Sequence, residues 1–233
     1  MGVAGNKTKG EYRMHRHAVV AGATGLVGHA LVRRLLDEPA YGTVTLLVRR
    51  SAEIEHPKLR ERKVDFDALE QAGIEFGGAD VFCALGTTIK KAGSQEAFRR
   101  VDYAYPLSLA RSAKSQGARQ LLIVTSLGAN SSSRAFYTRV KGELEEALRA
   151  LGLPALHLFR PSLLLGERAE FRLGERLMSA ALEPLSPLFS IGSLRKYRPV
   201  RAESVARAMV RAALRDESGV RVHENDSIPN EAE

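Results

Sequence analysis

Ten residues near the start of the chain decide its fold: Val19-Val20-Ala21-Gly22-Ala23-Thr24-Gly25-Leu26-Val27-Gly28. The apolar residues from His17 to Ala21 predict a buried strand. Apolar residues then recur at helical spacing, at Val27, Leu31, Val32, Leu35 and Leu36. The stretch therefore predicts a strand that runs into a glycine-rich turn and from there into a helix.

The glycines of this turn suit a dinucleotide. Gly22 permits a tight turn, Gly25 lets the backbone approach a pyrophosphate, and Gly28 lets the helix pack closely on the strand. The helix N-terminus adds free N–H groups and a favourable dipole. We expect a dinucleotide to contact Gly22, Thr24, Gly25, Leu26, Val27 and Gly28. The alternative is a glycine-rich connection that holds no ligand.

Strands and helices alternate along the rest of the chain. Further strands are predicted at Thr43–Val48, Lys63–Asp65, Asp80–Leu85, Gln120–Thr125 and Ala155–Phe159. Helices are predicted at Ser94–Gln116, Ala135–Leu151, Leu173–Leu182 and Ala202–Leu214. Pro106 is expected to break or start a helix, and Gly152 to end one. Nearly continuous apolar strands between helices indicate a parallel sheet covered on both faces. With the glycine turn after the first strand, the pattern predicts an α/β protein with a doubly wound Rossmann sheet.

The 233 residues suffice for one such domain with a small appendage. We expect residues 1–16 to be a flexible basic tail, residues 17–216 to be a single nucleotide-binding domain, and residues 217–233 to be a polar tail. From about residue 162 the periodicity loosens, and an extended piece is expected at Tyr197–Val200. This region predicts a small C-terminal lobe over the cofactor cleft.

Composition narrows the classes of function. The net charge is +8, but the basic residues are dispersed among acidic ones, so we expect no nucleic-acid partner. No apolar run is long enough to cross a bilayer, which predicts that the chain has no membrane span. Cys83 is the one cysteine, so a reducing compartment fits, and we expect a cytoplasmic location. His15 and His17 lack partners at metal-ligand spacing, and no metal site is expected. The expected partner is therefore a small-molecule substrate.

The end of the second predicted strand indicates which dinucleotide binds. An acidic residue at this position would accept bonds from the ribose hydroxyls of NAD(H). Here the strand ends in Val48-Arg49-Arg50, and two guanidinium groups can clasp a 2′-phosphate. NADP(H) is therefore the preferred cofactor, and NAD(H) remains possible. Alternatively, Arg49 and Arg50 are only exposed charges. Asp65 is placed to bond the adenine amino group, or it is a turn carboxylate.

Two further strand ends are expected to border the cofactor. The fourth strand runs into Leu85-Gly86-Thr87-Thr88, where Gly86 lets the backbone pass close to a ribose. Thr87 and Thr88 either bond that ribose or cap the loop. The sixth strand runs into Arg160-Pro161-Ser162, whose backbone either borders the nicotinamide or only ends the strand.

Tyr137 and Lys141 are the candidate catalytic pair. Their spacing places both on one face of a predicted helix. A nearby ammonium group favours the phenolate form of a tyrosine, which can then exchange a proton with a substrate oxygen. Ser126 ends the fifth predicted strand, and its hydroxyl could bond the same oxygen. The alternative is a surface helix on which Tyr137 packs and Lys141 is solvated.

Together these residues resemble the atypical branch of the short-chain dehydrogenase/reductase superfamily, and within it the Tat-interacting-protein-like oxidoreductase family. The likeness covers about Ala18–Leu185. Besides the glycine turn and the strand ends quoted above, it rests on Phe82-Cys83-Ala84, on Thr125-Ser126-Leu127-Gly128-Ala129-Asn130, on Tyr137-Thr138-Arg139-Val140-Lys141-Gly142-Glu143 and on Phe159-Arg160-Pro161-Ser162.

The resemblance implies a Rossmann fold, bound NADP(H) and a triad of Ser126, Tyr137 and Lys141. In that triad the tyrosine is the acid or base, the serine orients the substrate oxygen, and the lysine binds the nicotinamide ribose. Two positions depart from the pattern: Asp102 stands where extended members carry asparagine, and Ser162 stands where glycine is usual. The short C-terminal lobe argues against a large sugar-nucleotide substrate.

Two functions follow from these features. The first is an NADP(H)-dependent oxidoreductase that transfers hydride to or from a small carbonyl or alcohol, with Tyr137 as acid or base. The alternative is an NADPH-binding regulatory or redox-sensing protein with little turnover. The helices predicted near Ala104–Gln116 and Ala135–Leu151 could pair in a homodimer, as they do in many members of the superfamily.

Overall fold

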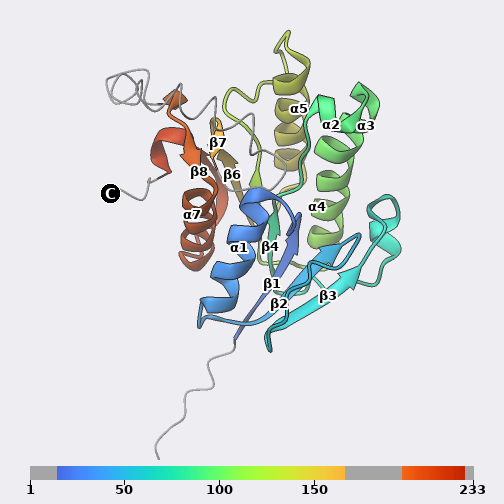
Figure 1. The fold of residues 1–233 in the computed structure, drawn as a ribbon, viewed down its shortest axis with the longest axis vertical. Helices are drawn as coiled ribbons and strands as arrows, with labels where there is room; N and C mark the ends of the chain where they lie inside the picture. Colours follow the sequence, from blue (N-terminus) through green and yellow to red (C-terminus); the bar gives the residue numbers. More distant parts are fainter. Residues whose placement is uncertain (1–14, 166–195, 229–233) are drawn as a thin grey trace, which may run out of the picture.

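A seven-stranded parallel sheet forms the centre of the computed structural model, which describes residues 15–165 and 196–228 (Figure 1). In spatial order its strands are β3 (Leu59–Lys63), β2 (Tyr41–Val48), β1 (Arg16–Ala21), β4 (Asp80–Cys83), β5 (Gln120–Val124), β6 (Ala155–Arg160) and β9 (Gly219–Glu224). The chain builds outward from β1 to β3, then returns to place β4 on the other side of β1. The strand order reverses there, as in a doubly wound sheet, and the predicted α/β Rossmann fold is confirmed.

Helices cover both faces of this sheet (Figure 1). One face carries α1 (Leu26–Asp37) and α7 (Ala202–Leu214), and the other carries α4 (Tyr105–Ser115) and α5 (Phe136–Ala150). Successive side chains of a strand point to opposite faces. Val20 therefore packs in the cluster with Leu31 and Met209, whereas Val19 packs in the cluster with Leu109 and Leu144. Burial on both faces explains why the strand sequences are almost continuously apolar.

The connection from β4 to β5 is more divided than the single helix predicted at Ser94–Gln116. It contains α2 (Ile89–Ala92), α3 (Gln95–Arg99), a π-helical turn η2 (Arg100–Ala104) and then α4. Pro106 lies in the first turn of α4. Since proline has no N–H and its ring clashes with the carbonyl four residues back, a regular helix cannot run through this point. The wider π turn lies immediately before the proline.

The two edge strands differ from the sequence prediction. β3 covers Leu59–Lys63, earlier in the chain than Lys63–Asp65, and only Leu59 is buried in it. β9 lies within residues 217–233, which were expected to be a polar tail. His223 of β9 stacks on Phe159 with 4.2 Å between ring centroids, and its Nε2 lies 3.0 Å from His157 Nδ1. Both strands are polar because they lie at sheet edges, so neither shows the apolar run that marks an inner strand.

The remaining described elements are short. A 3-10 helix η1 (Phe66–Gln71) follows β3, and another, η6 (Asn225–Ser227), follows β9. Strand β7 (Leu164–Leu165) pairs in parallel with β8 (Val200–Arg201). The helix predicted at Leu173–Leu182, and with it much of the predicted C-terminal lobe, lies outside the described residues. Within the described ranges, every helix is too short or too polar to cross a membrane.

Candidate functional site

The glycine-rich turn between β1 and α1 leaves no room for side chains at two of its glycines. Gly22 has a φ of +90°, and a Cβ there would lie 2.5 Å from the Ala84 carbonyl group. A Cβ on Gly28 would lie 1.9 Å from the Gly22 oxygen. Gly25 is the N-cap of α1, and glycine has no side chain with which to cap the helix. Its N–H donates to the Gly22 oxygen at 3.0 Å. The first turn of α1 therefore offers backbone N–H groups and a positive dipole end, which fit a phosphate.

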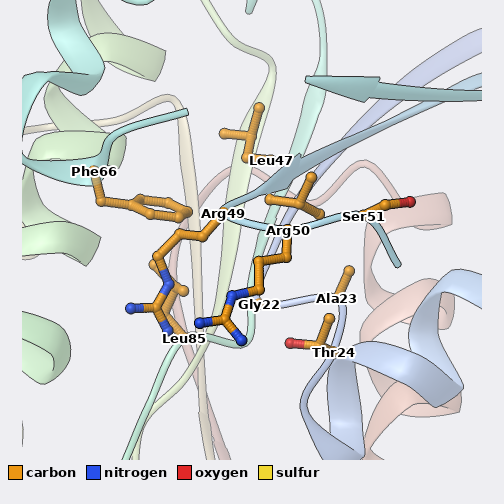
Figure 2. A pocket seen from close by; sticks show the side chains of 10 residues that line it. Gly22, Ala23, Thr24, Leu47, Arg49, Arg50, Ser51, Phe66 and Leu85 are labelled. Atoms are coloured by element: carbon orange, nitrogen blue, oxygen red, sulfur yellow. The ribbon is translucent and has the colours of Figure 1, made fainter. Parts of the chain in front are cut away.

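A cavity of about 650 Å³ opens beside this turn (Figure 2). The residues that line it come from the turn, from the end of β2 and from the loops after β3 and β4: Gly22, Ala23, Thr24, Leu47, Val48, Arg49, Arg50, Ser51, Phe66 and Leu85. It lies beyond the carboxyl ends of β1, β2 and β4, where doubly wound sheets bind nucleotides. No carboxylate is among these lining residues, so its formal charge comes from two arginines.

Arg49 and Arg50 point into the cavity from the end of β2. Both are exposed, and Figure 2 shows the guanidinium group of Arg50 directed toward the glycine-rich turn and that of Arg49 directed toward Leu85. The structure thus brings together residues 22, 24, 49, 50 and 85 of the predicted cofactor site. Two guanidinium groups without a neighbouring carboxylate are suited to a phosphate monoester.

Asp65 lies outside this lining and acts as a cap. Its Oδ1 accepts the Asp67 N–H at 3.0 Å at the start of η1. This is the turn-carboxylate alternative considered for the residue. The next residue, Phe66, presents its ring to the cavity instead and packs against Tyr105 with 5.4 Å between ring centroids.

The loop after β4 continues from the cavity toward the catalytic candidates. Leu85 lines the cavity, and Gly86 follows it. The Thr87 N–H donates to Asp102 Oδ2 at 2.8 Å, and Thr88 Oγ1 accepts the Lys91 N–H at 3.1 Å. Thr88 is therefore the N-cap of α2, the capping role that was one of its two predicted alternatives.

Ser126 and Tyr137 occupy neighbouring segments that are packed tightly together. Ser126 is the second residue of the loop after β5, and its hydroxyl donates to the Leu127 carbonyl oxygen at 3.2 Å. A Cβ on Gly142 of α5 would lie 2.1 Å from the Ser131 nitrogen, so this loop lies directly on the helix. Tyr137 is in the first turn of α5; it is 36% exposed, and its ring lies 5.5 Å from the Phe98 ring.

Lys141, one turn further along α5, is only 3% exposed. Its Nζ lies 2.7 Å from Oδ1 of Asp102, which is 1% exposed and belongs to the π turn η2. Burial is the largest single influence and lowers the pKa of Lys141, but Asp102, together with Tyr137 and Cys83, raises it, and the net result is a pKa above its ordinary value. Lys141 is therefore a charged and buried group. The alternative of a solvated lysine is wrong.

Hydrogen bonds and ion pairs hold the end of β6 and the segment that follows it. Arg160 donates to Glu145 at 2.5 and 3.0 Å and to Glu224 at 2.8 Å. The Ser162 N–H donates to Asn225 Oδ1 at 2.8 Å, and the Pro161 oxygen accepts the Leu127 N–H at 2.8 Å. The Arg160 guanidinium is thus bound to two carboxylates, and the backbone is what this segment can offer a nucleotide.

The sequence does not predict the place of two residues in the site, Phe66 at the cavity and Asp102 beside Lys141. The sequence favours the more polar Asp65 over Phe66 as a ligand of the nucleotide. It marks Asp102 only as a departure from asparagine and does not predict its pairing with Lys141. An aspartate that follows Arg99, Arg100 and Val101 gives no periodic signal, and the π turn to which it belongs is not visible in the sequence. Within the described residues, no cluster of three or more His, Cys, Asp or Glu side chains could hold a metal ion.

Comparison with known proteins defines the class. A family model described as NAD(P)H-binding matches residues 22–175. HTATIP2 of Rattus norvegicus is 38% identical over 176 residues, covering 73% of this chain and 72% of that protein. FMP52 of Eremothecium gossypii, named mitochondrial, is 32% identical over 218 residues, covering 91% of this chain and 95% of that protein. The chain belongs to this NAD(P)H-binding family of atypical short-chain dehydrogenases/reductases, together with HTATIP2 and the FMP52 proteins.

Solved structures agree on the fold. MoeE5 in complex with UDP-glucose and NAD matches with a TM-score of 0.66 at 16% identity, covering 88% of this chain and 74% of that chain. A short chain dehydrogenase family protein from Francisella tularensis matches with a TM-score of 0.63 at 13% identity, covering 91% and 98%. At these identities the likeness shows the Rossmann fold alone.

The expected cytoplasmic location is wrong by this comparison. FMP52 proteins from several yeasts are named mitochondrial, among them those of Candida albicans and Eremothecium gossypii. The expectation rested in part on the single cysteine, and a low cysteine count argues only against an oxidising compartment. It does not distinguish one reducing compartment from another.

Proposed function

We propose that the chain is an NADP(H)-dependent oxidoreductase. The observation that carries the proposal is the cavity at the glycine-rich turn, whose described lining contains Arg49 and Arg50 and no carboxylate. A ribose with free hydroxyls is usually held by an acidic side chain at this strand end, whereas a 2′-phosphate calls for guanidinium groups. The first turn of α1 would hold the pyrophosphate, and Phe66 would cover the adenine.

When bound, the nicotinamide supplies or accepts the hydride, and the chain supplies the proton chemistry. Tyr137 would exchange a proton with the oxygen of a small carbonyl or alcohol. Ser126 would donate to or accept from the same oxygen and so orient it. Lys141, buried and charged, would stabilise negative charge near the tyrosine and meet the ribose beyond Gly86.

Turnover with a panel of small aldehydes, ketones and quinones tests the assignment of Tyr137. We expect NADPH oxidation with at least one compound in the wild type. Tyr137→Phe should lower kcat by about 100-fold or more, as is typical when a general acid is lost. Tyr103→Phe, at another tyrosine on the neighbouring π turn, is the matched control and should keep its activity. Equal activity of Tyr137→Phe and wild type would contradict the role.

The second candidate is an NADPH-binding regulatory protein with little turnover. It is favoured by the pairing of Lys141 with Asp102, which engages the ammonium group that the oxidoreductase needs. Tight NADPH binding without oxidation of NADPH by any compound of the panel would support this candidate over the first.

A further inference from the structure

Asn225 is a buried carboxamide at the edge of the sheet where the candidate site lies. It is the first residue of η6, directly after β9, and is 3% exposed, whereas Asp226 and Ser227 after it are exposed. Because the strands are parallel, their carboxyl ends share one edge, and Asn225 lies at the same edge as the loops after β5 and β6. A buried polar side chain needs hydrogen-bond partners, and those of Asn225 show what it holds in place.

Both ends of the carboxamide are engaged. Oδ1 accepts the Ser162 N–H at 2.8 Å, and Nδ2 donates to the Arg198 carbonyl oxygen at 2.8 Å. The Ser162 hydroxyl donates to the same carbonyl oxygen at 2.5 Å. The bonds of Asn225 span 63 and 27 positions of the chain, so they join the end of β9 to the segment after β6 and to the approach to β8. A carboxamide suits this junction because it carries an acceptor and a donor side by side.

The turn that carries Asn225 is itself anchored on both sides. Before it, Glu224 Oε1 accepts from Arg160 Nη1 at 2.8 Å. After it, Ile228 is 1% exposed and belongs to the apolar cluster around Leu31. Asn225 therefore connects Ser162 to a part of the molecule that the core holds in place.

The same set of bonds reaches the loop that carries Ser126. The Pro161 carbonyl oxygen accepts the Leu127 N–H at 2.8 Å, and Leu127 directly follows Ser126. The loops after β5 and β6 are therefore bonded to each other, and Asn225 is bonded to the second of them. A displacement of Pro161 and Ser162 would also displace the loop of Ser126.

This junction lies on the other side of β4 from the cavity. The cavity is at the ends of β1, β2 and β4, whereas β5, β6 and β9 follow β4 in the sheet. A doubly wound sheet has two mononucleotide-binding halves, and a dinucleotide spans the point where the strand order reverses. With the adenosine half at Arg49 and Arg50, the nicotinamide half would lie over the ends of β5 and β6.

We propose that Asn225 is a positioning residue that holds the Pro161–Ser162 backbone and the Ser126 loop against the nicotinamide half of the bound dinucleotide. This inference rests on the proposed function and adds to it a residue from outside the predicted site. Without the carboxamide, the Ser162 N–H loses its acceptor and the segment is no longer held before the ligand arrives. The ligand must then order the segment on binding, which weakens its affinity.

The affinities for a whole dinucleotide and for its adenosine half test the proposal. NADPH carries both halves, whereas adenosine 2′,5′-bisphosphate lacks the nicotinamide half. We expect Asn225→Ala to raise the Kd for NADPH about 5- to 10-fold, as the loss of one or two hydrogen bonds would. The Kd for the bisphosphate should change by less than about twofold. Fluorescence titration and calorimetry measure the two constants. Should the wild type bind NADH more tightly than NADPH, NADH and AMP are the equivalent pair.

Ser227→Ala is the matched control for this comparison. Ser227 is in the same turn, and its hydroxyl donates to the Glu224 carbonyl oxygen at 2.7 Å rather than to the segment after β6. The control should leave both constants unchanged. If Asn225→Ala weakens both ligands equally, Asn225 only stabilises the fold, and if it weakens neither, Asn225 holds nothing that the nicotinamide half needs. Either result would overturn the proposal.

Hydrogen exchange in the wild type keeps the test decisive should Asn225→Ala fail to fold. We expect NADPH to slow amide exchange in the peptides that contain Ser162, Leu127 and Asn225 by more than saturating adenosine 2′,5′-bisphosphate does. If the two ligands protect these peptides equally, the segment does not meet the nicotinamide half and the proposal fails.

Turnover separates this inference from the proposed function, because both measurements above detect binding alone. A selective loss of NADPH affinity in Asn225→Ala, with no turnover in the wild type, would support the role of Asn225 while rejecting the oxidoreductase. Turnover in the wild type, with equal NADPH affinity in Asn225→Ala, would do the reverse.

Discussion

In the proposed function, Arg49 and Arg50 are the residues that would distinguish NADP(H) from NAD(H). Both are exposed and reach into the cavity, and no other formal charge lies in its described lining (Figure 2). The difference between the two cofactors is one phosphate group. A change of charge at this point should therefore alter the affinity for NADP(H), which carries the phosphate, much more than the affinity for NAD(H).

Arg49→Glu should separate the two cofactors. We expect the Kd for NADPH to rise about 10- to 100-fold, since a charge-assisted hydrogen bond contributes about 1.5–3 kcal/mol. The Kd for NADH should change by less than about threefold, because its ribose carries no phosphate. Fluorescence titration measures both constants. Arg33→Glu, an exposed arginine on α1, is the control for net charge. Equal losses for both nucleotides would contradict a 2′-phosphate site.

At the scale of single residues, the sequence predicts site residues whose type matches the ligand, and it does not predict residues whose place in the site depends on tertiary contacts. The two arginines and the glycines of the turn were predicted because their residue types match what a phosphate needs. The choice of Asp65 over Phe66 followed polarity, and the structure brings the apolar ring to the cavity. The Asp102–Lys141 pair was not foreseen because it joins residues 39 positions apart, and nothing local marks such a contact.

At the scale of the elements, the position of α1 depends on its close packing against the glycine-rich turn. The glycine at position 28 lies in the first turn of the helix, directly against the Gly22 oxygen. Alanine normally favours a helix over glycine by about 1 kcal/mol. Here the added methyl group would collide with backbone, which cannot move aside as a side chain can.

Gly28→Ala should therefore destabilise the protein by about 1–3 kcal/mol, the usual effect of overpacking. NADPH binding should also weaken, because the helix must move away from the turn that would hold the pyrophosphate. Urea denaturation and fluorescence titration measure the two effects. At Gly77 a Cβ would be 3.5 Å from the nearest atom, so Gly77→Ala is the control and should change stability by less than about 0.5 kcal/mol. A stabilised Gly28→Ala would contradict the packing argument.

Element prediction succeeded where strands are buried on both faces and failed at the sheet edges. β1, β4, β5 and β6 are inner strands, and their apolar runs located them to within two residues at each end. β3 and β9 lie at the edges, and their sequences resemble loops: β3 carries charged residues at its last four positions, and β9 carries Arg221 and Glu224. The π turn was missed for a different reason, since it depends on one additional residue in a helical turn rather than on composition.

At the scale of the whole molecule, the pair His157–His223 makes stability depend on pH. Burial lowers the pKa of His157 below its ordinary value. Burial, and after it the neighbouring His157 ring, lowers the pKa of His223 from 6.5 to about 4. Between about pH 6.5 and 4 the unfolded chain therefore binds more protons than the folded chain. By linkage, the stability contributed by the neutral pair is complete above pH 6.5 and is lost as the pH falls toward 4.

The expected result is a free energy of unfolding that declines over this range in the wild type and declines less in His223→Phe. The variant keeps an aromatic ring on Phe159 and removes the titrating group. Urea denaturation at several pH values measures the slope. His29→Phe, at an exposed position of α1, should retain the wild-type slope. Identical slopes in His223→Phe and wild type would rule out the pair as the source.

The strand order also dictates how the chain can assemble as it leaves the ribosome. Because the order is β3-β2-β1-β4-β5-β6-β9, each new strand joins a free edge and none has to insert between two others. The face covered by α1 is completed last, however. Val205 and Met209 of α7 complete the cluster around Leu31 and Leu35, and the Ala213 carbonyl accepts from Arg16 at 2.6 Å. Until about nine-tenths of the chain has been synthesised, the part of this cluster that α7 contributes is missing, although the sheet already covers α1 from its other side. A nascent chain that stops before residue 202 therefore lacks the α7 side of the cluster, and exposed apolar surface of this kind favours aggregation.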